Sequence, residues 1–179
     1  MKKLFLCLAL TAVCGFVTAA ETMDPATAEP GKLPAGWKAY ITGPQETQAE
    51  SGTVAVKEID GRKVLFLEDK SAGHEYGIVR TVPCKPGQYF RVTAKYRPAD
   101  GVTKFQGAEL TAHFIPAQKF RAGTVRPDKS GTAVLDTVKA PEGTRALQIY
   151  FYILRPTKLA VLIDSIEIES ADTPFPAAK

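Results

Sequence analysis

Hydrophobic and polar residues alternate with a period of two in many short segments of the chain, which is the pattern of β-strands with one buried face. The clearest example is residues 147–153. One side of this strand would carry the apolar side chains of Leu147, Ile149, Phe151 and Ile153. The opposite side would carry Gln148, Tyr150 and Tyr152. The pattern therefore predicts a core face and a second face with an amide and two aromatic rings.

Eight further segments show short apolar or alternating runs, and turn signals such as Asp60-Gly61, Pro86-Gly87, Asp100-Gly101 and Glu142-Gly143 separate them. The nine predicted strands are Trp37–Thr42, Thr53–Ile59, Lys63–Leu67, Tyr76–Val82, Tyr89–Tyr96, Ala108–Ile115, Thr132–Lys139, Ala146–Leu154 and Ala160–Ile168. Helical periodicity is scarce. The sequence thus predicts an all-β, antiparallel β-sandwich of the jelly-roll type, in a single domain.

The first residues have the features of an export signal. Lys2 and Lys3 precede an apolar run from Leu4 to Val17, and Thr18-Ala19-Ala20 offers small residues for cleavage. The apolar run is too short for a comfortable membrane span. We expect a signal peptide at residues 1–20 and a periplasmic or extracellular protein, with a lipid anchor at Cys14 as the alternative. Residues 21–32 would be a flexible leader, 33–170 the domain, and 171–179 a disordered tail.

Composition narrows the possible functions. Formal net charge is +4, from 23 basic and 19 acidic residues, and it falls to +2 without Lys2 and Lys3. The charges are interspersed, with no basic stripe, so a nucleic-acid partner is not expected. Cys84 alone would remain after cleavage, which excludes an intrachain disulfide and predicts a small buried side chain rather than a reactive thiol. Trp37 is expected in the core more readily than at a binding surface.

Asp164 shares the parity of Leu162, Ile166 and Ile168 in the last predicted strand, so alternation directs it toward the core. A buried carboxylate needs a partner, a metal ion or a proton. A structural calcium ion fits an exported protein with two histidines and no cysteine pair. The alternatives are a local bulge or hydrogen bonds to backbone amides.

Several polar and aromatic residues are expected on outward faces. Tyr40 has the opposite parity from Ala39 and Ile41, and Glu109, Thr111 and His113 alternate with apolar residues. Glu109 and His113 would lie about 13 Å apart, too far for a direct acid–base pair. Flat rings beside amides and charged groups suit sugars, because rings pack on C–H patches while polar groups bind hydroxyls. No nucleophile elbow, zinc motif or phosphate loop occurs.

Four segments occur in an order that resembles a known family. They are Leu33-Pro-Ala-Gly-Trp37, Val82-Pro-Cys-Lys-Pro-Gly-Gln-Tyr89, Ala140-Pro-Glu-Gly-Thr144 and Ile163-Asp-Ser-Ile166. Together they resemble the galactose-binding-like jelly rolls, especially the family 4 and 9 carbohydrate-binding modules, over residues 33–169. Two departures stand out, because Ser165 replaces the second residue of a usual Asp-Asp pair and the segment that often precedes the Trp motif is absent. Tyr150 takes a position that is often small.

The resemblance implies a glycan-binding cleft on the concave sheet. Its carbohydrate-binding positions would be Tyr40, Arg80, Thr111, Phe120, Gln148 and Tyr152, and outward parity adds Glu109, His113 and Tyr150. Asp164 would hold a structural calcium ion, with backbone oxygens near Gly52. The expected function is non-catalytic binding of a polysaccharide or oligosaccharide, in cooperation with a separate glycan-active enzyme or a surface complex. The alternatives are a protein-interaction or cell-surface assembly module and a small polysaccharide lyase or hydrolase.

Overall fold

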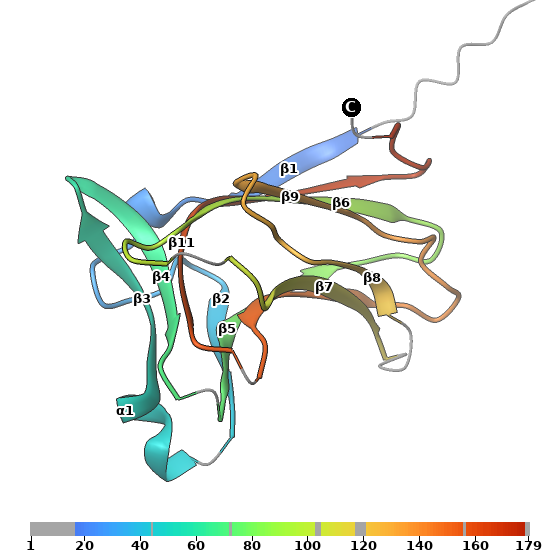
Figure 1. Ribbon diagram of the computed structural model, residues 1–179. Coiled ribbons are helices and arrows are strands. Elements are labelled where there is room, and N and C mark those ends of the chain that lie inside the picture. The colour runs from blue at the N-terminus through green and yellow to red at the C-terminus, as the bar shows by residue number, and fades with distance from the viewer. Residues whose placement is uncertain are drawn as a thin grey trace, which may run out of the picture.

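The computed structural model describes residues 17–43, 45–71, 73–102, 105–116, 121–155 and 157–177, which form two antiparallel sheets packed face to face (Figure 1). One sheet has the order β3 (Gly52–Ile59), β4 (Arg62–Asp69), β11 (Leu159–Ala171), β6 (Tyr89–Pro98) and β9 (Thr132–Asp136), with β1 (Val17–Met23) also paired to β11. The other has the order β2 (Trp37–Thr42), β5 (Glu75–Pro83), β10 (Ala146–Ile153), β7 (Ala108–Ile115) and β8 (Arg121–Val125). The predicted all-β sandwich is confirmed.

Helices in the described part of the chain are limited to η1 (Pro25–Thr27), η2 (Gln45–Thr47) and α1 (Gln48–Ser51). None of these is long or apolar enough to cross a lipid bilayer. α1 lies at the far end of the extension formed by β3 and β4, away from the body of the sandwich (Figure 1).

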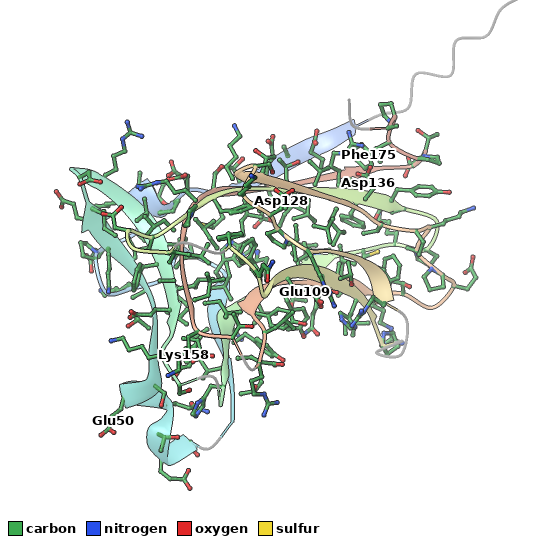
Figure 2. The ribbon with its side chains drawn as sticks, in the orientation of Figure 1. Glu50, Glu109, Asp128, Asp136, Lys158 and Phe175 are labelled. Carbon is green, nitrogen blue, oxygen red and sulfur yellow. The ribbon has the colours of Figure 1, made fainter. Side chains whose placement is uncertain are left out.

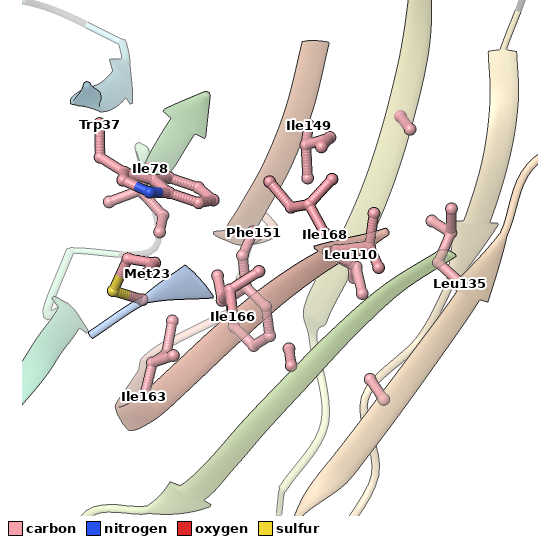
Figure 3. Close-up of a cluster of buried hydrophobic side chains, with 14 of the residues drawn as sticks. Met23, Trp37, Ile78, Leu110, Leu135, Ile149, Phe151, Ile163, Ile166 and Ile168 are labelled. Carbon is pink, nitrogen blue, oxygen red and sulfur yellow. The ribbon is translucent and has the colours of Figure 1, made fainter. Parts of the chain in front are cut away.

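The core lies between the two sheets, where side chains from both inner faces meet (Figure 3). Strand β10 shows the principle, because its alternate residues Leu147, Ile149, Phe151 and Ile153 are all fully buried. Trp37 and Cys84 are also buried, as the sequence predicts, and burial raises the pKa of the Cys84 thiol to about 11. Stability therefore comes from a continuous apolar core, with β10 at its centre.

The nine predicted strands are all present, with ends shifted by a few residues, and two strands were not expected. β8 is short, and Val125 is the one bulky apolar residue in its sequence Arg-Ala-Gly-Thr-Val, which is too weak a pattern to mark a strand. β1 overlaps the region of the expected signal and leader.

Residues 21–32 are part of the fold instead of a flexible leader. β1 pairs with the C-terminal half of β11, and Met23 is only 2% exposed. Gly31 donates a backbone hydrogen bond to Val56, and the Val56 amide donates to Lys32, at 2.8 and 3.0 Å. These bonds cover the outer edge of β3, which would otherwise offer unpaired backbone groups. The expected cleavage after Ala20 remains a prediction, and it would keep the Glu21–Met23 half of β1.

The beginning of the expected disordered tail is also held by contacts. Ala171 ends β11 and is buried. Arg91, which forms a two-pronged ion pair with Asp136, donates a hydrogen bond of 2.7 Å to the carbonyl of Pro176 and lies 4.8 Å over the ring of Phe175. Figure 2 shows Asp136 and Phe175 near one another at this end of the six-stranded sheet. Residues 172–177 thus fold back on the sandwich.

The prediction that Asp164 points into the core is wrong. A register shift between Ile163 and Ser165 places a bulge in β11, and the Asp164 side chain is 42% exposed. Leu162 packs with Val64 and Phe66 in a cluster separate from the main core, whereas Ile166 lies in the main core, because the extra residue changes the side on which alternate residues of the strand emerge. Asp164 therefore faces solvent, with Arg97 3.8 Å away.

Candidate functional site

The outward face of the five-stranded sheet collects the aromatic residues that the sequence singled out. Strand register forms three rows across this sheet. The first row is Tyr40, Gly77, Tyr152 and Glu109; the second is Lys38, Val79, Tyr150, Thr111 and Thr124; the third is Thr81, Gln148, His113 and Arg121. Residues on four or more strands are thus brought to one surface, although they lie up to 114 positions apart in the chain, from Lys38 to Tyr152.

Gly77 allows the side chains of Tyr40 and Tyr152, in the first row, to come into contact across β5. Tyr40 and Tyr152 lie on strands that flank β5, and next-nearest strands are about 10 Å apart. Their ring centroids are nevertheless only 5.5 Å apart, at an interplanar angle of 73°. A Cβ atom on Gly77 would lie 2.3 Å from the Cβ of Tyr152. The missing side chain therefore lets the strands approach and the two rings meet above β5.

The rings and two polar residues surround a small hollow, which we call the tyrosine hollow. It has a volume of about 160 Å³ and is lined by Tyr40, Thr111, His113, Tyr150 and Tyr152. Tyr40 contacts Tyr150 edge to face at 5.1 Å, and the His113 ring contacts Tyr150 at 5.8 Å. Mutual edge-to-face packing fixes the orientation of these rings. This volume corresponds to about five water molecules, and the hollow is open to solvent.

Hydrogen bonds to acidic residues hold two of the tyrosines. Tyr40 donates to Glu75 at 3.0 Å, and Tyr152 donates to Glu109 at 2.7 Å. Burial, followed by the bond to Glu75, raises the pKa of Tyr40 to about 12. Burial and Glu109 raise the pKa of Tyr152 as well. Both phenols stay protonated at physiological pH, and their hydroxyl oxygens remain available as acceptors.

A second hollow lies beside the first on the same face, and we call it the donor hollow. It has a volume of about 410 Å³ and is lined by Gly36, Lys38, Val79, Arg80, Thr81 and Gln148. The two hollows are separated by Tyr150 and Gln148, which share a hydrogen bond of 2.9 Å from the Tyr150 hydroxyl to the Gln148 Oε1. We refer to the two hollows together as the depression, and most of their lining residues come from strands β2, β5, β10 and β7.

The predicted site residues differ in how far they are accessible. Tyr40, Gln148, Tyr150, Tyr152 and His113 are partly exposed and line one of the hollows. Thr111 lines the tyrosine hollow, but it is 2% exposed and donates to the Gly123 carbonyl. Glu109, on β7 in the lower sheet of Figure 2, is 5% exposed and accepts the hydrogen bond of Tyr152 from the neighbouring strand. Phe120 lies outside the described residues.

Arg80 does not share the tyrosine face. Its strand neighbours of the same parity, Ile78 and Val82, are buried in the core. The Arg80 guanidinium pairs with Glu21 of β1 and donates to the Ala35 carbonyl at 3.2 Å. It reaches only the rim of the donor hollow, against Gly36. The expectation of an outward Arg80 is therefore corrected, because the residue follows the inward parity of β5.

The residues expected to hold calcium are not brought together. Gly52 pairs with Asp69, and Asp69 pairs with Leu159, which lies five residues along β11 from Asp164. That separation is about 16 Å along the strand direction alone. Within the described ranges, no cluster of three or more His, Cys, Asp or Glu side chains could hold a metal ion. Asp164 and Gly52 do not fit a shared calcium site.

Three residues of this face were not singled out from the sequence. Lys38 shares the parity of Tyr40 on β2, so alternation alone could have placed it on this face. Glu75 begins β5 just before the predicted strand. Gly77 carries no side chain, and its role depends on the close approach of β10, for which the sequence has no local signal.

No protein-family model matches the chain, and no curated protein sequence matches it. Solved structures do resemble it. The enzymatically active domain of tailspike protein 4 from bacteriophage CBA120 aligns with a TM-score of 0.52 and 16% identity over 74% of this chain. The chain spans only about a fifth (19%) of that tailspike chain.

Two carbohydrate-binding modules align over nearly their whole length. A module named BiXyn10A CBM1 aligns with a TM-score of 0.51 and 14% identity, over 83% of this chain and 95% of the module. A family 4 module, designated CBM4, aligns with a TM-score of 0.51 and 12% identity, over 80% of this chain and 90% of the module. At such identities the likeness concerns the fold. The chain therefore has the β-sandwich fold of carbohydrate-binding modules, as its sequence motifs suggested.

Proposed function

We propose that this protein binds a carbohydrate chain, without acting on it chemically, in the depression formed by the tyrosine hollow and the donor hollow. The observation that carries the proposal is the meeting of Tyr40, Tyr150 and Tyr152 around an open hollow on one sheet face. Aromatic rings offer apolar surface to sugar C–H groups, and the polar groups beside them, His113 and Gln148, can bind hydroxyls. The binding modules of similar fold support this reading.

The acidic residues favour binding over catalysis. A glycoside hydrolase places two carboxyl groups across an open subsite, one on each side of the scissile bond. Here neither Glu75 nor Glu109 lines the tyrosine hollow, and each accepts a hydrogen bond from a tyrosine hydroxyl. In this proposal, the carboxylates of Glu75 and Glu109 hold the rings of Tyr40 and Tyr152 in place.

The test is retention on a glycan array and in affinity electrophoresis. Replacing Tyr150 or Tyr152 by alanine should weaken binding about tenfold or more, because an aromatic anchor in the centre of a site carries much of the binding energy. Tyr89→Ala is the matched control, since Tyr89 is half-exposed on the other sheet. Unchanged retention of both site variants would refute the proposal. Loss of a protein partner in a pull-down, with glycan retention absent throughout, would favour an interaction module instead.

We further propose that the protein acts outside the cytoplasm, where it presents a glycan to a separate enzyme or surface complex. The support for export is the charged, then apolar, then small-residue pattern of residues 1–20. N-terminal sequencing of the mature protein should begin at Glu21. A mature chain that still begins at Met1 would contradict export by this signal.

A further inference from the structure

Among the described residues, those that line the donor hollow present hydrogen-bond donors to solvent and include no carboxylate. Its polar lining comes from Lys38, Thr81 and Gln148, with the guanidinium of Arg80, which is engaged by Glu21 and the Ala35 carbonyl, at the rim. An ammonium and a guanidinium group are donors only, whereas a carboxylate is an acceptor only. The lining is therefore chemically complementary to an anion or to a group rich in acceptor oxygens.

Gln148 is oriented as a donor by its neighbour. The Tyr150 hydroxyl donates to the Gln148 Oε1, so the carbonyl end of the amide is directed toward Tyr150. The Nε2 end, with two N–H groups, has no hydrogen-bond acceptor within the ranges that the structure describes. Tyr150 thus acts on both hollows, because its ring lines the tyrosine hollow and its hydroxyl orients the Gln148 amide in the donor hollow.

Lys38 supplies an uncompensated positive charge. It is exposed and forms no ion pair with any described residue, whereas the charge of Arg80 is balanced by Glu21. The carboxylates of the same face, Glu75 and Glu109, lie at its other end beside Tyr40 and Tyr152. The donor hollow therefore has a cation without a paired carboxylate, whereas at the other end the two carboxylates bond tyrosine hydroxyls and the positive charge of Arg155 opposes the rise in the Tyr40 pKa.

The third row of the sheet carries further hydrogen-bond donors. Thr81, Gln148, His113 and Arg121 follow one another across four neighbouring strands. Four strands span about 14 Å, and each of these positions carries a group that can donate a hydrogen bond. A glycan chain that crosses the strands along this row would meet donors over its whole path.

We infer that the glycan bound here carries an anionic group, a uronic acid carboxylate or a sulfate ester, which occupies the donor hollow while a neutral ring face contacts the tyrosines. This inference rests on the proposed carbohydrate binding. Charge-assisted bonds to Lys38 and Gln148 would add to affinity and would fix which end of the chain lies in the donor hollow.

The experiment compares matched ligands on the full protein. A glycan array that pairs uronate-containing oligosaccharides with their carboxyl-reduced forms, across several linkages, should show the acidic member bound about fivefold tighter. Sulfated and unsulfated pairs form the second arm and identify which anion is recognised. The preference should shrink between 0.05 and 0.5 M salt, because ions screen exposed charges.

Lys38→Gln should reduce the acidic-to-neutral affinity ratio to nearly one. Lys129→Gln, in the exposed turn between β8 and β9, is the matched control and should keep the ratio of the unmodified protein. Equal binding of acidic and neutral partners would overturn this inference and leave the proposed function standing. Absence of binding to every glycan on the array would overturn both.

Discussion

Replacing Gly77 by alanine tests whether close approach of β5 and β10 shapes the tyrosine hollow. The added Cβ atom would meet the Cβ of Tyr152 at 2.3 Å, the backbone carbonyl oxygen of Phe151 at 2.4 Å and the Cα of Tyr152 at 2.6 Å. Two of these three atoms belong to the β10 main chain, so no side-chain rotation can relieve the contact. The two strands must move apart.

The expected cost follows from these contacts. Overpacking of this kind costs about 1–3 kcal/mol, and the main-chain contacts place Gly77→Ala in the upper half of that range. Stiffening of the unfolded chain offsets about 0.4–1 kcal/mol. We therefore expect a loss of about 2 kcal/mol in the free energy of unfolding, and a fall in Tm of about 4–8 °C for a chain of this size.

The measurement is urea and thermal unfolding followed by circular dichroism. Gly73→Ala is the control, because Gly73 lacks a positive φ and its added Cβ would meet only the Ser71 hydroxyl, at 3.8 Å. We expect the control to stay within about 0.5 kcal/mol of the unmodified protein. Gly77→Ala should also weaken glycan retention, since it separates Tyr40 from Tyr152. Equal stability of the two variants would refute the argument that β5 and β10 require a glycine here.

Three further outcomes are expected. Tyr152→Phe should lower the free energy of unfolding, measured in urea, by about 2 kcal/mol, because it leaves the buried carboxylate of Glu109 without its 2.7 Å hydrogen bond. An unchanged midpoint of the urea unfolding curve would mean that Glu109 finds another partner. The protein should lose stability as pH rises from 10 toward 12, because the tyrosine side chain has a pKa near 10 in the unfolded chain whereas burial raises the pKa of Tyr40 in the folded protein to about 12. Tyr40→Phe should reduce this loss. If the variant and the unmodified protein lose the same stability over this pH range, the pKa shift of Tyr40 is contradicted. Asp164→Asn should alter the free energy of unfolding by less than about 0.5 kcal/mol, and added calcium should leave the Tm of the unmodified protein unchanged. If calcium raises Tm and this substitution abolishes the rise, Asp164 does bind calcium.

Much of the candidate site could be predicted because β-strands have a strict period. The alternation in residues 146–154 placed Gln148, Tyr150 and Tyr152 on one face, and the structure confirms that face. The same rule placed Tyr40 correctly from another strand. The partners of these residues could not be predicted, since strand order and register depend on contacts between distant segments. The hydrogen bond from Tyr152 to the buried Glu109 and the pairing of Arg80 with Glu21 are examples.

The sequence by itself determined the all-β sandwich, its nine main strands and the burial of Trp37 and Cys84. It also determined that Tyr40, Tyr150 and Tyr152 point outward. These features follow from local periodicity and turn residues, which act over a few positions. Only the tertiary structure decided that a bulge turns Asp164 outward and that Gly77 lets two rings meet across a strand. It also decided that residues 21–32 complete a sheet edge. Each of these depends on how closely separate strands approach, a property that no single segment carries.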